Sequence, residues 1–115
     1  MTFICYPKCT TCQKARQWLE ARSLKYAVRD LKIDNPTYEE LADWFKRSGW
    51  PLRKFFNTSG LLYKSLTLKD KLPAMNEDEQ LKLLATDGML VKRPLLVGED
   101  FVLVGFKEKE WSEKL

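Results

Sequence analysis

The sequence predicts an α/β fold in which a βαβ unit and a ββα unit share one mixed four-stranded sheet. Two strand-forming segments flank a helical pattern at the start of the chain, and two more lie near its end, separated by a Gly-Glu-Asp turn. Between these halves we expect a helical insertion at about residues 36–88. A length of 115 residues is that of one ordinary domain, so residues 1–115 are predicted to form a single domain.

The βαβ unit lies at the start of the chain. Residues 2–6 are rich in β-formers and are followed by a proline, which predicts a short buried strand. Thr10 is expected to be the N-cap of a helix over residues 11–22. One side of this helix is apolar at helical spacing: Cys12, Ala15, Trp18 and Leu19. Residues 25–29 are predicted to form a second strand, parallel to the first because a helix separates the two.

The middle of the chain is predicted to be helical. Asn35 and Pro36 are typical of an N-cap and a first helical residue, and an apolar stripe then runs to the vicinity of Gly49. The stripe consists of Tyr38, Leu41, Ala42 and Phe45. Further helices are expected at residues 51–56, 61–66 and 76–85, the last with an asparagine cap and three acids in its first turn.

The ββα unit follows an Arg93-Pro94 pair. Leu95–Val97 and Phe101–Val104 flank the Gly-Glu-Asp turn and are predicted to form a β-hairpin. A short terminal helix is expected to carry Trp111.

Composition restricts the classes of function. The net charge is +4, but the basic residues are interleaved with acids, which favours a solvated surface over direct nucleic-acid binding. No apolar run approaches the ~20 residues of a membrane helix, so no membrane association is expected. The chain opens on a strand-like segment instead of an export signal and has an odd number of cysteines, which favours a cytoplasmic protein. The absence of histidine excludes Cys-His dyads and His metal ligands.

The main candidate for chemistry is the Cys-x-x-Cys sequence at Cys9 and Cys12, between the first strand and the first helix. At that helix terminus, unpaired N–H groups and the positive end of the helix dipole stabilise a thiolate. Lys8 and Lys14 add positive charge, so the pKa of Cys9 is expected to lie below that of a free thiol. Cys12, on the apolar side of the helix, suits a resolving thiol.

Two other roles for Cys9 and Cys12 are less favoured. Both could be small buried residues, because free cysteine is often part of a core. A zinc site is disfavoured, because one Cys-x-x-Cys supplies two of four ligands and no histidine completes the set, so no metal is predicted. Cys5 lies within the first predicted strand and is expected only to pack.

An arginine close to the thiolate would bind an anion or stabilise the thiolate itself. Arg93 is the preferred candidate, because it precedes Pro94 and a buried strand; a surface ion pair is the alternative. Composition alone does not distinguish Arg53 from Arg47.

Three segments together resemble the arsenate reductase (ArsC), Spx and MgsR family of thioredoxin-like proteins. They are Cys9-Thr-Thr-Cys12-Gln-Lys-Ala15, Leu52-Arg53 with Asn57-Thr58, and Leu90-Val-Lys-Arg93-Pro94-Leu-Leu-Val97. Their order and spacing run through nearly the whole chain. The resemblance implies a thioredoxin-like fold with a helical insertion, a cis bond at Arg93–Pro94 and Cys9 as the catalytic thiol. The second cysteine is closer to the Cys-x-x-Cys members of the family than to its true arsenate reductases.

In the arsenate reductases of this family, three arginines bind the oxyanion, and glutathione with glutaredoxin supplies the electrons. Arg53 and Arg93 match two of these arginines, while the third is expected near Gly105, where this chain has none. The missing contact is worth ~1.5–3 kcal/mol, which weakens oxyanion binding.

The leading prediction is a thiol-disulfide oxidoreductase with Cys9 as nucleophile and Cys12 as resolving thiol. Arg53, Arg93 and Lys8 are the expected anion or thiolate partners. No bound cofactor is expected; glutathione is the expected co-substrate, with glutaredoxin or thioredoxin as further electron donors. Two alternatives stay open: a Spx-like redox-sensing regulator that binds the RNA polymerase α subunit, with Gly49 near a glycine that matters for docking in Spx, and a glutaredoxin-dependent arsenate reductase.

Overall fold

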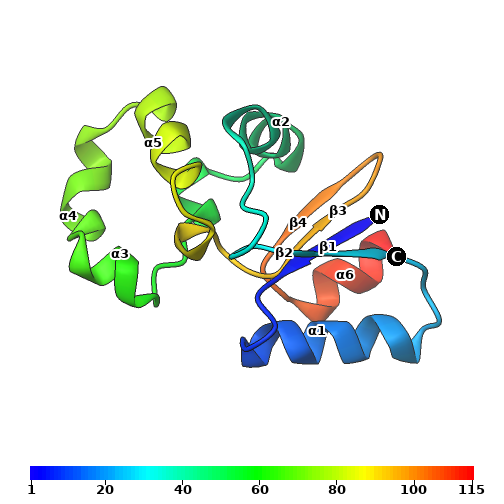
Figure 1. The fold of residues 1–115 in the computed structure, drawn as a ribbon. Coiled ribbons are helices and arrows are strands. Elements are labelled where there is room, and N and C mark those ends of the chain that lie inside the picture. The colour runs from blue at the N-terminus through cyan, green and yellow to red at the C-terminus, as the bar shows by residue number, and fades with distance from the viewer.

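The protein, described over residues 1–115 by a computed structural model, has the predicted βαβ and ββα halves around one sheet (Figure 1). The four strands are β1 (Thr2–Cys5), β2 (Ala27–Asp30), β3 (Leu95–Val97) and β4 (Val102–Val104). Their order across the sheet is β2-β1-β3-β4, with β1 parallel to β2 and antiparallel to β3. The mixed four-stranded sheet is therefore confirmed, and a helix joins its two parallel strands as a parallel pair requires.

Six α-helices and three short 3₁₀ helices complete the chain. The α-helices are α1 (Thr10–Ala21), α2 (Tyr38–Ser48), α3 (Leu61–Ser65), α4 (Leu68–Lys71), α5 (Glu77–Leu84) and α6 (Glu108–Lys114). The 3₁₀ helices are η1 (Leu52–Phe55), η2 (Leu72–Ala74) and η3 (Gly88–Leu90). No helix combines the length and the apolar character that crossing a bilayer would require.

The alternation of side chains along the strands divides the core into two parts. Phe3 and Cys5 of β1 face α1 and α6, where they pack with Leu19 and Trp111. Ile4 faces the opposite side and joins the larger cluster, which includes Leu41 of α2 and most of the helical insertion. In Figure 1, α1 and α6 lie on one face of the sheet, α2 lies on the other, and α3, α4 and α5 extend beyond the end of the sheet.

The start of α1 differs from the prediction. The N-cap is Cys9 and Thr10 is the first helical residue, so the prediction that Thr10 is the N-cap was wrong. The reason is the turn that precedes the helix: the N–H of Cys9 donates to Tyr6 O at 2.9 Å, which holds Cys9 in an extended conformation. Its own carbonyl then accepts the first helical bond, from Gln13 N at 3.1 Å.

The start of α2 also differs. Thr37 is the N-cap, in place of Asn35, and it forms a capping box with Glu40. Asn35 has a different task, because its side-chain amide donates to Ala85 O at 2.9 Å and ties the segment before α2 to the end of α5. The predicted end of this helix is confirmed: Gly49 caps α2 in the left-handed conformation, with φ of 73°.

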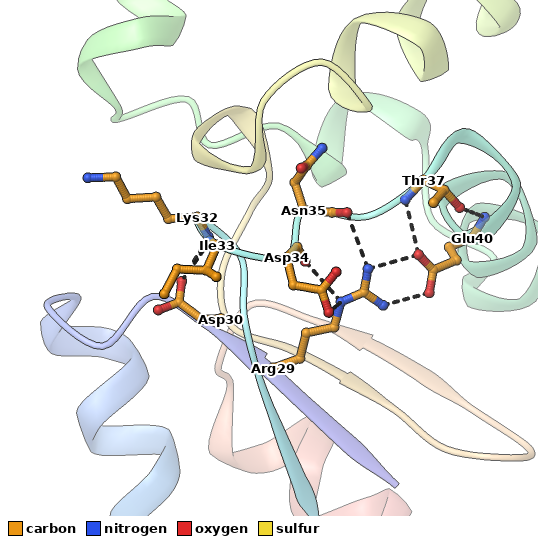
Figure 2. Close-up of polar contacts among 8 residues, drawn as sticks. All are labelled: Arg29, Asp30, Lys32, Ile33, Asp34, Asn35, Thr37 and Glu40. Carbon is orange, nitrogen blue, oxygen red and sulfur yellow. Dashed lines mark hydrogen bonds and ion pairs between the residues drawn. The ribbon is translucent and has the colours of Figure 1, made fainter.

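A partly buried ion pair fixes the insertion to the sheet (Figure 2). Arg29 of β2 donates to both carboxylate oxygens of Glu40, at 2.6 and 2.8 Å, and to the backbone oxygens of Asp34 and Asn35. The pKa of Glu40 is lowered to about 2, first by its hydrogen bonds with Arg29. Strand β2 and helix α2 are thus joined by a fork of two parallel hydrogen bonds.

The remaining differences concern short elements. The predicted helix at residues 51–56 is the 3₁₀ helix η1, and the second strand begins at Ala27, two residues later than expected. Helix α4 and η2, over residues 68–74, were not predicted individually. The hairpin is confirmed, although Phe101 belongs to the turn: Gly98 N donates to Phe101 O at 2.9 Å, and only residues 102–104 form β4.

Candidate active site

A cavity of about 660 Å³ opens beside the first turn of α1. It is lined by segments that lie far apart in the sequence and meet at one end of the sheet. The segments are Cys9 and Thr11, a central stretch made of Trp50, Arg53, Lys54, residues 56–60 and Tyr63, the pair Lys92 and Arg93, and residues 104–107 with Glu110. The fold therefore brings together Cys9, Arg53 and Arg93, three of the residues singled out in the sequence.

Cys9 is half-buried and occupies the N-cap of α1. The Cys9 side chain makes no N-cap hydrogen bond, yet the pKa of Cys9 is lowered from the usual 9.0. Burial alone would raise this pKa; the backbone and thiol of Cys12, the backbone of Thr11 and the guanidinium of Arg93 outweigh burial by stabilising the thiolate. Cys9 is the more acidic and the more accessible thiol of the pair.

Cys12 has the opposite character. Only 2% of it is exposed, and it packs in the same cluster as Ala15 and Trp18 of α1. Burial, followed by the nearby charge of Cys9, raises the pKa of Cys12 to about 12. Each thiol is among the causes that shift the pKa of the other, so the side chains of Cys9 and Cys12 are close enough to interact across the first turn of α1.

Arg93 reaches the site from the segment before β3. The Arg93–Pro94 peptide bond is cis, as the resemblance implied. The guanidinium donates to Met89 O at 3.4 Å, lies 5.3 Å from the centre of the Tyr6 ring and contributes to the low pKa of Cys9. Arg93 is therefore positioned as a partner of the thiolate.

The other two predicted cations differ in position. Arg53, on η1, lines the cavity and is exposed. Lys8 is exposed and does not line the cavity, and it is not among the groups that lower the pKa of Cys9. Lys8 as a thiolate partner therefore stays a prediction.

Gly105 lines the same cavity. Its φ of 74° is left-handed, and its N–H donates to Pro94 O at 2.8 Å, while its carbonyl accepts from Trp111 Nε1 at 3.1 Å. A Cβ at this position would lie only 3.2 Å from Cε of Lys92. The space where the resemblance expected a third arginine is thus next to the side chain of Lys92.

Cys5 is 3% exposed in β1, and burial raises its pKa, so this thiol belongs to the core. No cluster of three or more metal-ligating side chains occurs in the structure.

Comparison with known proteins assigns the chain to a family. The sequence model of the ArsC family matches residues 5–114. The chain belongs to the ArsC family. Two curated relatives come from Bacillus subtilis. The uncharacterized protein YusI is 50% identical over 113 residues, which cover 98% of this chain and 96% of YusI. The regulatory protein MgsR is 31% identical over 110 residues, which cover 96% of this chain and 86% of MgsR.

Solved structures of ArsC-related proteins have the same fold. An ArsC family related protein from Bacteroides fragilis superimposes with a TM-score of 0.96 and 57% identity, over 97% of this chain and 94% of that one. A "possible arsenate reductase" from Streptococcus mutans gives a TM-score of 0.88 and 43% identity, over 96% of each chain. This ArsC-family chain is therefore a thioredoxin-like protein whose relatives include both regulators and proteins described as reductases.

Sequence reasoning missed two residues of the ArsC-family cavity. Lys92 was overlooked beside Arg93, although a basic residue next to a candidate site residue was a usable signal. Trp50 forms part of the wall between Lys54 and Lys107, whose ammonium groups lie 5.6 and 5.9 Å from its ring centre. No pattern in the sequence places Trp50 there, because its position depends on how η1 packs against the rest of the chain.

Proposed function

We propose that this ArsC-family protein is a thiol-disulfide oxidoreductase in which Cys9 attacks and Cys12 resolves. The contrast between the two thiols is the observation that carries the proposal: Cys9 has a lowered pKa and faces a cavity, while adjacent Cys12 is buried with a raised pKa. A thiolate is the nucleophile in disulfide exchange, so this arrangement determines which sulfur reacts first.

The proposed reaction has two steps. The Cys9 thiolate attacks one sulfur of a disulfide R–S–S–R, forms a Cys9–S–S–R bond and releases one R–S⁻. Cys12 then loses its proton to solvent and attacks the Cys9 sulfur, which releases the second R–S⁻ and leaves a Cys9–Cys12 disulfide. The two cysteine thiols supply both electrons. Two molecules of glutathione, or the dithiol of glutaredoxin or thioredoxin, return the protein to the dithiol form in a reducing compartment such as the cytoplasm.

The order of the steps follows from the electrostatics of the pair. Burial is the main cause that raises the pKa of Cys12, and the negative charge of Cys9 raises it further. Once Cys9 is bound in a mixed disulfide, that charge is gone, and the pKa of Cys12 falls toward the range in which its thiolate forms. Reaction of Cys9 thus removes one of the effects that oppose ionisation of Cys12.

A stoichiometry experiment tests this mechanism. With excess 5,5′-dithiobis(2-nitrobenzoate), the native protein should release two thiolates and end as an internal disulfide. The Cys12→Ser variant should release one thiolate and keep the other half of the reagent bound to Cys9, which mass spectrometry detects. The Cys9→Ser variant should release no thiolate on the time scale of the native reaction. Cys5→Ala, which changes the third thiol, is the matched control and should behave as the native protein. Release of two thiolates from Cys12→Ser, or undiminished reaction of Cys9→Ser, would refute the assignment.

A redox-sensing regulator is the second candidate, favoured by the 31% identity with MgsR. In this case the Cys9–Cys12 disulfide would alter binding to the RNA polymerase α subunit instead of completing a catalytic cycle. Capture of the purified α subunit by oxidised but not by reduced protein, with no sustained turnover of disulfides in the presence of glutathione, would favour the regulator over the oxidoreductase.

Glutaredoxin-dependent arsenate reduction is a narrower form of the enzymatic proposal. It is favoured by 43% identity with the possible arsenate reductase of Streptococcus mutans and by the presence of Arg53 and Arg93 in the cavity. Formation of arsenite from arsenate with glutathione and glutaredoxin, dependent on Cys9, tests it directly.

A further inference from the structure

The cavity beside Cys9 carries an excess of positive charge. Five cationic side chains line it, namely Arg53, Lys54, Lys92, Arg93 and Lys107, against a single acidic one, Glu110. Glu110 lies 4.0 Å from Lys107, and none of the other four cations has a carboxylate within ion-pair distance. A concave surface with several cations that lack protein counter-charges attracts anionic ligands.

The backbone at Lys92 is held in place by pairing with the segment that ends η1. Its N–H donates to Phe55 O at 2.7 Å, and the preceding Val91 pairs with Phe56 in an isolated antiparallel bridge. The side chain is half-buried, and its Cε lies against the surface of Gly105. A larger residue at Gly105 would need this space, so the absence of a side chain there lets Lys92 line the same cavity as Cys9 and Arg93.

The walls of the cavity suit an organic ligand. Trp50 lies between Lys54 and Lys107, and Phe56, Tyr63 and Phe106 add further aromatic surface. A volume of about 660 Å³ falls in the range of cavities that hold small organic molecules and greatly exceeds the size of one tetrahedral oxyanion.

We infer that Lys92 is the specificity-determining cation of this cavity and that it selects disulfides carrying carboxylate groups near the sulfur. This inference rests on the proposed function, because it names the substrate class for attack by Cys9. The carboxylate would contact Lys92 and Arg93 while the disulfide lies over the Cys9 sulfur and the apolar part of the ligand lies toward Trp50.

Two chromogenic disulfides separate substrate charge from thiol reactivity. 5,5′-Dithiobis(2-nitrobenzoate) carries two carboxylates, whereas 4,4′-dithiodipyridine is neutral at neutral pH. The measured quantity is the second-order rate constant for attack of Cys9 on 5,5′-dithiobis(2-nitrobenzoate) divided by that for attack on 4,4′-dithiodipyridine. Any effect of a mutation on the pKa of Cys9 alters both rates alike and cancels in this ratio, so the ratio reports recognition of the anion.

In Lys92→Met the ratio should fall about fivefold at low ionic strength, the effect of two unit charges about 4 Å apart at a dielectric constant close to that of bulk water, as expected for a cavity open to solvent. Lys92→Arg, which keeps the charge, should restore most of the ratio. Lys25→Met is the matched control: it removes the same charge from an exposed site beyond the other end of α1 and should leave the ratio unchanged.

The outcomes distinguish the two proposals. A native-like ratio in Lys92→Met, or an equal fall of the ratio in Lys25→Met, would overturn the role of Lys92. If Cys9 still reacts and Cys12 still resolves in these variants, the proposed oxidoreductase function is not affected. If Cys9 reacted with neither reagent, the proposed function itself would fail, and the substrate class with it.

Discussion

The Arg29–Glu40 pair allows a prediction of stability from the structure (Figure 2). Glu40→Gln removes the negative charge but keeps a side chain that can still complete the capping box with Thr37. The mutation therefore isolates the ionic part of the link between β2 and α2.

The magnitude follows from the pKa of Glu40. A pKa of about 2 instead of the usual 4.5 corresponds to at most about 3.4 kcal/mol, since one pKa unit is worth about 1.36 kcal/mol. The Glu40 side chain is 35% exposed and that of Arg29 is 17% exposed, so solvent screening reduces the expected loss in Glu40→Gln to about 1–2 kcal/mol at neutral pH.

The pH dependence of this contribution has a definite direction. The pKa of Glu40 is lower in the folded protein than in the unfolded chain, so the folded protein binds its proton less readily. The stabilisation is complete above about pH 5 and is lost as the pH falls toward 2. The difference in stability between native protein and Glu40→Gln should therefore shrink by more than half between pH 7 and pH 3.

Urea unfolding followed by tryptophan fluorescence at both pH values measures this difference. Glu39→Gln is the matched control, because Glu39 lies in the same first turn of α2 and makes no ion pair. An equal loss of stability in Glu39→Gln, or a Glu40→Gln difference that is the same at pH 7 and pH 3, would refute the reasoning.

Two further predictions concern the core and the thiolate. Gly88→Ala should lower the free energy of unfolding by about 1–3 kcal/mol in urea titrations, because a Cβ would overlap the carbonyl oxygen of Leu31; a loss below about 0.5 kcal/mol would contradict this contact. Arg93→Met should move the pH midpoint of Cys9 alkylation by iodoacetamide upward, because the guanidinium stabilises the thiolate. Lys8→Met is its control and should move the midpoint less; equal shifts would contradict the placement of Arg93.

Much of the fold could be predicted because its signals are local. The Cys-x-x-Cys sequence lies where a β-forming segment changes to helical periodicity, and that transition alone places Cys9 at the start of a helix. The αL cap at Gly49 and the Gly-Glu-Asp turn of the hairpin are likewise determined by a few neighbouring residues.

The errors arose where distant contacts decide between similar local options. Asn35 and Thr37 are both good N-caps, and the choice between them depends in part on Ala85, fifty residues away, which binds the Asn35 amide. The Thr-x-x-Glu pattern from Thr37 to Glu40 was a capping-box signal that could have settled the matter. At Thr10, the hydrogen bond from Cys9 to Tyr6 shifted the cap by one residue.

The site could be predicted only in part for the same reason. Cys9 and Cys12 are one helical turn apart, so sequence alone brings their side chains to neighbouring positions. Lys92 precedes the hairpin and Gly105 follows it, and only the folded chain shows that the absence of a side chain at Gly105 makes room for Lys92.

The bond from Trp111 Nε1 to the Gly105 carbonyl makes α6 part of the scaffold of the site. The same tryptophan is fully buried in the cluster that holds Cys12. Unwinding of α6 would therefore remove the hydrogen-bond donor of the Gly105 carbonyl and expose the apolar cluster in which Cys12 is buried. Truncations that remove α6 are therefore expected to alter the reactivity of the thiols.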